Sequence, residues 1–118
     1  MDIEFRRIAQ SRIGERSLSP QSLGTVFCDH MLVAECRDGE WSDVRIEPYG
    51  PLPLPLPISA LQYGIFRFRR TQAFRTVSGE VVLFRPYENW ERLRRSCRRL
   101  VLPEVPGDLY IEGLRQLI

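Results

Sequence analysis

All 17 cationic side chains of this 118-residue sequence are arginine, and the sequence contains no lysine. A guanidinium group stays protonated near neutral pH and is not a nucleophile, whereas a lysine amine can form an imine with an aldehyde or ketone. No side chain of this sequence can therefore form such an imine. Arginine instead suits anion binding, because its planar fork donates two hydrogen bonds to a carboxylate or phosphate at once.

The densest run of arginines follows Trp90 and has helical periodicity. Four side chains recur there at helical spacing and should face the core: Trp90, Leu93, Cys97 and Leu100. Five arginines occupy the remaining faces: Arg92, Arg94, Arg95, Arg98 and Arg99. Two interpretations stay open for Arg92. It belongs either to a solvated basic face or to an anion-binding site.

Cys28, Asp29 and the single histidine, His30, are the other residues that could carry chemistry. Neighbours in a strand point to opposite faces, so Asp29 and His30 are not a ready acid–base pair. Cys28 and His30 share a face if the strand is regular, which allows a thiol–imidazole pair. A structural His30 is the alternative, because nothing else marks a nucleophile site. The three cysteines lack metal-ligand spacing and are expected to be reduced cytosolic thiols.

Two hairpins should support these residues. The first has strands at 25–36 and 41–49, with an Asp38-Gly39 turn between them and with Val44 and Ile46 on one face. The second has strands at 65–76 and 81–84, joined by a Ser78-Gly79 turn. In its first strand Phe66 and Phe68 alternate with Arg67 and Arg69, a pattern that predicts one buried face.

Prolines and small polar residues divide the rest of the chain. Residues 1–23 read as an irregular N-terminal arm, whose apolar residues either form a short strand or lie over the core. Every second residue from Pro51 to Pro57 is proline, which excludes an interior strand and favours an extended surface segment. That segment could be a ligand for a proline-recognition module, although it lies inside the domain.

Three helices are expected. A short one over 58–63 ends at Gly64, and a long one begins at an Asn89 N-cap and ends before Pro103. The last begins at Gly107-Asp108, and four residues form its candidate buried stripe: Leu109, Ile111, Leu114 and Ile118. Strands followed by helices predict an α+β fold, a single domain over 1–118 with an antiparallel sheet and two C-terminal helices packed on it.

The bulk composition favours a folded cytoplasmic protein. Hydrophobic residues make up 43% of the chain and charged residues 27%. No run of 18 apolar residues predicts a membrane span, and the charged N-terminus does not resemble a secretory signal. A net charge of +2 and the absence of a recognition motif argue against a nucleic-acid partner.

From Phe27 to Ile118 the sequence resembles the small N-terminal domain of branched-chain aminotransferases, which are fold-type IV (class IV) enzymes that use pyridoxal phosphate. The similarity lies in VFCDHML at 26–32, in LQYGIFRF at 61–68 and, without a gap, in LFRPYENWERLRRSCRRLVLP at 83–103. Such enzymes hold pyridoxal phosphate as an imine on a lysine. The resemblance therefore implies that this sequence, without a lysine, is not itself a pyridoxal-phosphate transaminase. No metal is expected, and pyridoxal phosphate is expected only if a separate large domain completes the site.

The resemblance also implies four ligand-binding residues. Arg92 matches the arginine that pairs with the cofactor phosphate in the family. Phe27, Tyr63 and Phe68 match aromatic residues that wall the substrate pocket. Core packing is the alternative role for these three aromatics. No catalytic residue can be assigned from the sequence.

Several positions depart from the family pattern. The family usually has Phe-Glu-Gly where this chain has Phe68-Arg69-Arg70. Gln72 replaces a lysine, and Gln62 replaces a histidine that precedes the tyrosine. The change to arginine places long cations where the family keeps a carboxylate and bare backbone.

Three functions are compatible with these features. The chain could be a repurposed domain that binds, or converts without pyridoxal phosphate, a small carboxylate or acyl-type metabolite in a biosynthetic pathway. It could be a non-catalytic small subunit that docks on an aminotransferase large domain. It could also be a truncated, inactive fragment. The sequence stops before the family's large domain, so an uncovered apolar face leads us to expect a homo-oligomer, most simply a dimer.

Overall fold

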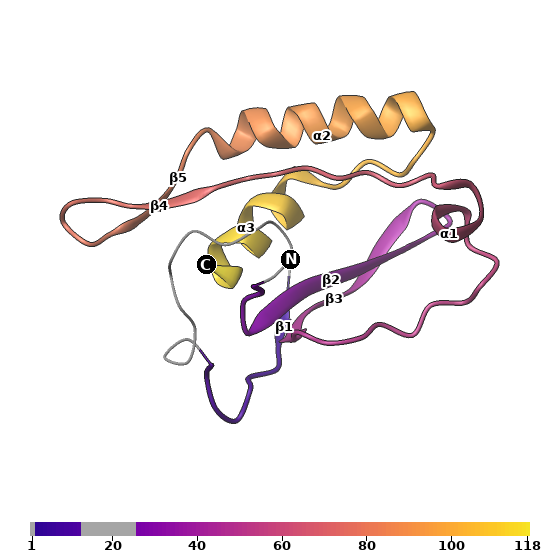
Figure 1. Cartoon of the computed structure of the whole chain (residues 1–118). Coiled ribbons are helices and arrows are strands. Elements are labelled where there is room, and N and C mark those ends of the chain that lie inside the picture. The colour runs from indigo at the N-terminus through magenta and orange to yellow at the C-terminus, as the bar shows by residue number, and fades with distance from the viewer. Residues whose placement is uncertain (1, 13–25) are drawn as a thin grey trace. The chain divides into compact units, whose positions relative to one another are not determined.

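The computed structural model describes residues 2–12 and 26–118 (Figure 1). The chain divides into two compact units, residues 2–52 and 53–116. Strands dominate the first unit, and helices dominate the second. The strands form one three-stranded and one two-stranded sheet, and two helices end the chain. The α+β class predicted from the sequence is confirmed. The prediction of a single domain stays a prediction.

The first unit is a three-stranded sheet. Its strands are β1 (Glu4–Phe5), β2 (His30–Arg37) and β3 (Glu40–Pro48), in the order β1-β3-β2. β2 and β3 pair antiparallel, whereas β1 runs parallel to β3. The predicted turn is present, with φ of 53° at Asp38 and 84° at Gly39. Positive φ at both central residues is the geometry that matches the twist of a tight hairpin.

The structure corrects two of the sequence-based predictions for this unit. The N-terminal arm is not wholly irregular, because β1 pairs with β3 at Phe5 opposite the fully buried Ile46. The strand expected over 25–36 begins only at His30, and residue 25 lies outside the described residues. The last paired residues are His30 and Pro48, and just beyond them the Tyr49 N–H still donates to the Asp29 carbonyl at 2.9 Å.

The second unit begins with an extended proline-rich segment outside any strand, as expected. The short helix α1 (Ser59–Tyr63) follows and ends at Gly64. The φ of this residue is 66°, in the left-handed region that glycine adopts without steric cost. The two-stranded sheet consists of β4 (Ala73–Arg75) and β5 (Val81–Leu83), joined by the predicted turn at Ser78-Gly79.

The long strand predicted over 65–76 is wrong. Only Ala73–Arg75 pair within it, because β5 offers three partners before Arg85, with φ of 49°, turns the chain into the next helix. The expected buried face is also wrong. Phe66 is 64% exposed and Phe68 is 63% exposed, while Arg69 is partly buried. β5 is one residue shorter than predicted and leaves Phe84 exposed.

The helix α2 (Pro86–Leu100) begins three residues earlier than the predicted Asn89 N-cap. Proline fits the first turn of a helix because its missing N–H has no partner there. Val101, with φ of 55°, ends the helix, and the Leu102 N–H donates to the Cys97 carbonyl at 2.9 Å. Cys97 is buried as predicted, whereas Leu100 is exposed because it lies in this last, open turn.

Helix α3 (Gly107–Leu117) follows closely. The Trp90 indole N–H donates to the Val105 carbonyl at 2.8 Å. A Cβ at Gly107 would lie only 3.0 Å from the Trp90 ring, so glycine permits this close approach. Leu109 is buried as predicted, but Ile118 lies beyond the helix and is exposed.

Within the described residues, no helix combines the length and apolarity that crossing a bilayer requires. The same residues contain no group of three or more His, Cys, Asp or Glu side chains suited to a metal ion. The three cysteines are free thiols.

Candidate anion-binding cleft

A cavity of about 400 Å³ lies in the second unit, between the chain before β4 and helix α2. Nine residues line it: Phe68, Arg69, Arg70, Thr71, Gln72, Phe74, Phe84, Asn89 and Arg92. We call this cavity the arginine cleft. Three of its lining residues are cationic, and none carries a carboxylate. Its composition therefore favours a small anion with some apolar surface.

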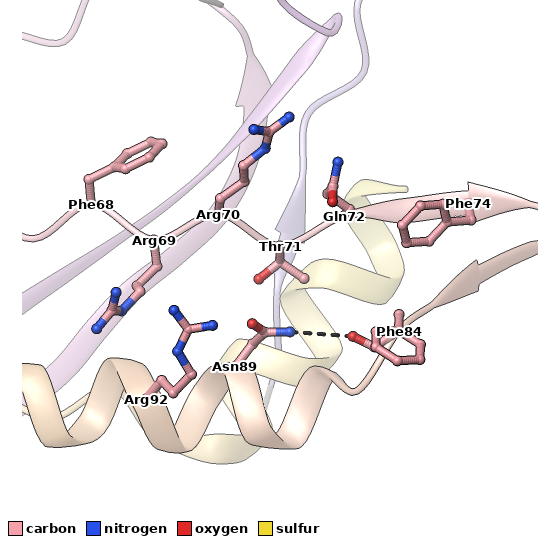
Figure 2. Close-up of a pocket in the computed structure, with 9 residues that line it drawn as sticks. All are labelled: Phe68, Arg69, Arg70, Thr71, Gln72, Phe74, Phe84, Asn89 and Arg92. Atoms are coloured by element: carbon pink, nitrogen blue, oxygen red, sulfur yellow. Dashed lines mark hydrogen bonds between the residues drawn. The ribbon is translucent and has the colours of Figure 1, made fainter.

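The segment 68–72 runs extended past α2, so its side chains alternate (Figure 2). Arg69 and Thr71 point toward the helix, whereas Phe68 and Arg70 point to the other side (Figure 2). Arg92 rises from α2 toward Arg69 (Figure 2). The side of the segment that faces the helix is thus polar.

Three hydrogen bonds fix the walls of the cleft. The Asn89 amide donates to the Phe84 and Arg85 carbonyls at 3.3 and 3.0 Å, which joins the end of β5 to the first turn of α2. The Thr71 and Tyr110 hydroxyls lie 2.5 Å apart and join the segment to α3. The helical pattern assigned Asn89 to a cap, but its side chain binds carbonyls from within the first turn.

Beside the cleft, the guanidinium groups of Arg67 and Arg69 both contact the Ser96 hydroxyl. Arg67 Nη2 and Arg69 Nη2 donate to the Ser96 hydroxyl oxygen at 2.5 and 2.6 Å. That hydroxyl in turn donates to the Arg92 carbonyl at 2.9 Å. Arg69 Nε is buried and has no acceptor among the described residues. One neutral oxygen therefore serves two cations.

The electrostatics of Arg69 reflect this crowding. Burial lowers the pKa of Arg69, and the nearby charges of Arg67, Arg92 and Arg95 lower it further. In the part of the chain that the structure covers, none of these four arginines forms an ion pair with a carboxylate. An anion bound here would relieve both the repulsion and the unsatisfied donor.

The four ligand-binding residues predicted from the sequence are distributed unevenly. Phe68 and Arg92 line the arginine cleft, although the Phe68 ring points away from Arg92 (Figure 2). Tyr63 lies in α1, is 79% exposed and is not among the lining residues. Phe27 belongs to the first unit and stacks on Tyr49 with ring centroids 4.6 Å apart. Their roles in ligand binding stay predictions.

Arg67, Arg69 and Ser96 form a hydrogen-bonded group at and beside the cleft, yet sequence patterns did not single them out as a site. Two signals were present. Arg69 stands where the family usually has glutamate, and Ser96 follows Arg92 by four residues, which places both on one helix face.

The Cys28, Asp29 and His30 group has a structural arrangement. The Cys28 thiol donates to the His30 carbonyl at 2.8 Å and not to the imidazole. His30 Nε2 accepts from the Ile8 N–H at 3.3 Å. Asp29 accepts from the Ser11 hydroxyl at 2.6 Å, and that bond, together with Arg12, lowers the pKa of Asp29. These contacts hold residues 8–12 beside β2, which supports the structural interpretation of His30.

A comparison with curated proteins finds relatives of this chain. A branched-chain-amino-acid aminotransferase of Mycolicibacterium smegmatis is 38% identical over 111 residues, which cover 93% of this chain and 30% of that protein. Branched-chain-amino-acid transaminase 1 of Bacillus subtilis is 42% identical over 102 residues, covering 84% and 29%. A branched-chain-amino-acid aminotransferase of Mycobacterium tuberculosis is 39% identical over 105 residues, covering 88% and 28%.

These matches confirm the resemblance found in the sequence. The homologues of this chain are branched-chain aminotransferases, and the matched length is consistent with their small N-terminal domain. The chain spans about 30% of the length of the curated relatives it matches. No protein-family model matches the chain.

Proposed function

We propose that this chain, whose homologues are branched-chain aminotransferases, binds a small carboxylate or acyl-type metabolite in the arginine cleft. We further propose that it does so without forming a pyridoxal-phosphate imine, as a domain repurposed within a biosynthetic pathway. The observation that carries this proposal is the pair Arg69 and Arg92. Both line the cleft, and neither has a carboxylate partner in the described residues.

The residues of the cleft fit an anion with an aliphatic skeleton. A guanidinium group can take both oxygens of a carboxylate. Phe74 and Phe84 line the same cavity and offer apolar surface that demands no hydrogen bond. The ligand's charged end would therefore lie at the arginines and its carbon skeleton against the rings.

The residues do not fit pyridoxal phosphate as a covalently held cofactor. Arg92 can contact a phosphate, but the 118 residues contain no side-chain primary amine that could anchor the aldehyde. Adding pyridoxal phosphate to the purified chain should give no internal-aldimine absorbance. Acetylation of the N-terminal amine controls for a weak imine at that group.

Carboxylate binding can be tested with 3-methylbutanoate as the probe. We expect this probe to raise the melting temperature of the chain, and Arg92→Gln to remove most of that rise, because a charged hydrogen bond is worth more than a neutral one. Arg98→Gln is the matched control, since Arg98 lies on the same helix but pairs with Glu104. An unchanged melting temperature with this probe would contradict the proposal.

A second candidate function is that of a small domain working with an aminotransferase large domain. The matched share of the relatives and the exposed apolar side chains Tyr63, Phe66 and Phe84 favour it. Mixing the chain with a lysine-containing large-domain fragment should then restore pyridoxal-phosphate absorbance and transamination. The homo-oligomer expected from the sequence stays a prediction, and light scattering would measure it.

A further inference from the structure

Two guanidinium groups converge on a single point beside the arginine cleft. Arg67 Nη2 and Arg69 Nη2 both meet the Ser96 hydroxyl oxygen, at 2.5 and 2.6 Å. A serine oxygen carries no formal charge, so these contacts lack the strength of a pair between a cation and an anion. The geometry therefore concentrates donors on a place where only a neutral acceptor is present.

The two glutamates of α2, and Glu104 in the segment after it, pair with other arginines. Glu88 pairs with Arg85, and Glu91 pairs with Arg94. Glu104 pairs with both Arg94 and Arg98. Across the described ranges, no carboxylate pairs with Arg67 or Arg69. The guanidinium charges of Arg67 and Arg69 beside Ser96 thus have no counter-charge among residues 2–12 and 26–118.

We propose that a phosphate group binds between Arg67 and Arg69, at the point where both now contact the Ser96 hydroxyl. A phosphate monoester offers three acceptor oxygens and up to two negative charges, which suits two converging guanidinium groups better than a monocarboxylate does. A small turn of the Arg69 guanidinium would also give its Nε–H, now without an acceptor, an oxygen to bind.

The ligand class that fits is a small phosphorylated metabolite. Acidic side chains at Glu88, Glu91 and Glu104 interrupt the basic surface, which disfavours the long backbone of a nucleic acid. The proposal rests on the proposed function to the extent that Arg69 also lines the cleft. Arg67 does not line the cleft, so a variant at Arg67 tests the phosphate site without altering the carboxylate site in the arginine cleft.

Calorimetric titration of the full chain with inorganic phosphate tests the site. We expect saturable binding, and Arg67→Gln should weaken it roughly tenfold because a charged hydrogen bond is lost. Arg67→Gln should leave the binding of 3-methylbutanoate unchanged. Arg94→Gln is the matched control, because Arg94 already pairs with Glu91 and Glu104, and it should leave phosphate binding unchanged.

Ser96 gives a second, independent variant that keeps the helix intact, since alanine is a strong helix former. Ser96→Ala should leave phosphate affinity equal or higher, because the competing acceptor is gone. Ser96→Asp should abolish phosphate binding, because its carboxylate occupies the site. Equal phosphate affinity in the wild type and Arg67→Gln would overturn the proposal. So would binding of a single-stranded oligonucleotide without binding of inorganic phosphate.

Discussion

Two faces of helix α2 carry arginines, but their surroundings differ. On one face Arg94 and Arg98 meet Glu91 and Glu104, and Arg94 also lies over the Trp90 ring at 5.0 Å. We call this the paired face. On the other face Arg92 and Arg95 lie near Arg67 and Arg69, around Ser96. We call this the open face.

The difference shows how one arginine-rich helix can serve two purposes. On the paired face the cations have fixed partners, so they belong to the structure that joins α2 to the chain before α3. On the open face they have a neutral hydroxyl and a buried, unsatisfied Nε–H. A charge without a partner in the fold is available to a ligand.

The largest effect on stability should come from the side of α2 that carries Trp90. Gly107→Ala places a Cβ about 3.0 Å from the Trp90 ring, and we expect it to lower the free energy of unfolding by about 1–3 kcal/mol. Urea unfolding measures this loss. Gly50→Ala is the control, because a Cβ there would lie 4.0 Å from the Pro48 carbonyl oxygen. Equal stabilities of the two variants would contradict the close packing.

A charge reversal on the open face should act in the opposite direction. Arg69→Glu introduces the missing carboxylate among Arg67, Arg92 and Arg95, so we expect the melting temperature to rise by several degrees. The same variant should lose phosphate binding. Differential scanning fluorimetry measures the shift, and Arg98→Glu should lower the melting temperature because it breaks the pair with Glu104. A fall for Arg69→Glu would show that the open face is already neutralised.

The smallest effect should come from the exposed pairs of the paired face. The hydrogen bond from Arg98, with help from Arg94, lowers the pKa of Glu104. This carboxylate therefore stabilises the fold above its unfolded pKa, and that contribution is lost as pH falls through the lowered folded value. Glu104→Gln should reduce the melting temperature slightly at pH 7. The difference should shrink as pH falls below the unfolded pKa of about 4.5 and vanish below the lowered folded pKa. A difference independent of pH would exclude this ion pair as its cause.

Local sequence signals predicted the parts of the fold that local chemistry determines. The Asp38-Gly39 turn, the Gly64 stop and the Ser78-Gly79 turn all depend on backbone preferences of single residues. The wrong predictions concern features that depend on residues distant in the sequence. The strand predicted over 65–76 does not form in full because its partner β5 has only three residues. The residue pattern within 65–76 contains no information on the length of that partner.

The candidate site was likewise predicted only in part. Family resemblance identified Arg92, and the structure places it in the arginine cleft. Arg67 and Ser96 were missed because their importance comes from the pairing of the nearby glutamates with other arginines. The sequence gives the number of charges but not which of them are paired.

The most direct test observes the arginine side chains themselves. In a ¹H–¹⁵N spectrum of the Nε–H groups, added inorganic phosphate should shift the Arg69 resonance, which now lacks an acceptor. The Arg94 and Arg98 resonances should stay in place, because both Nε–H groups already donate to Glu104. An unmoved Arg69 resonance at saturating phosphate, or equal shifts on both faces, would contradict the account.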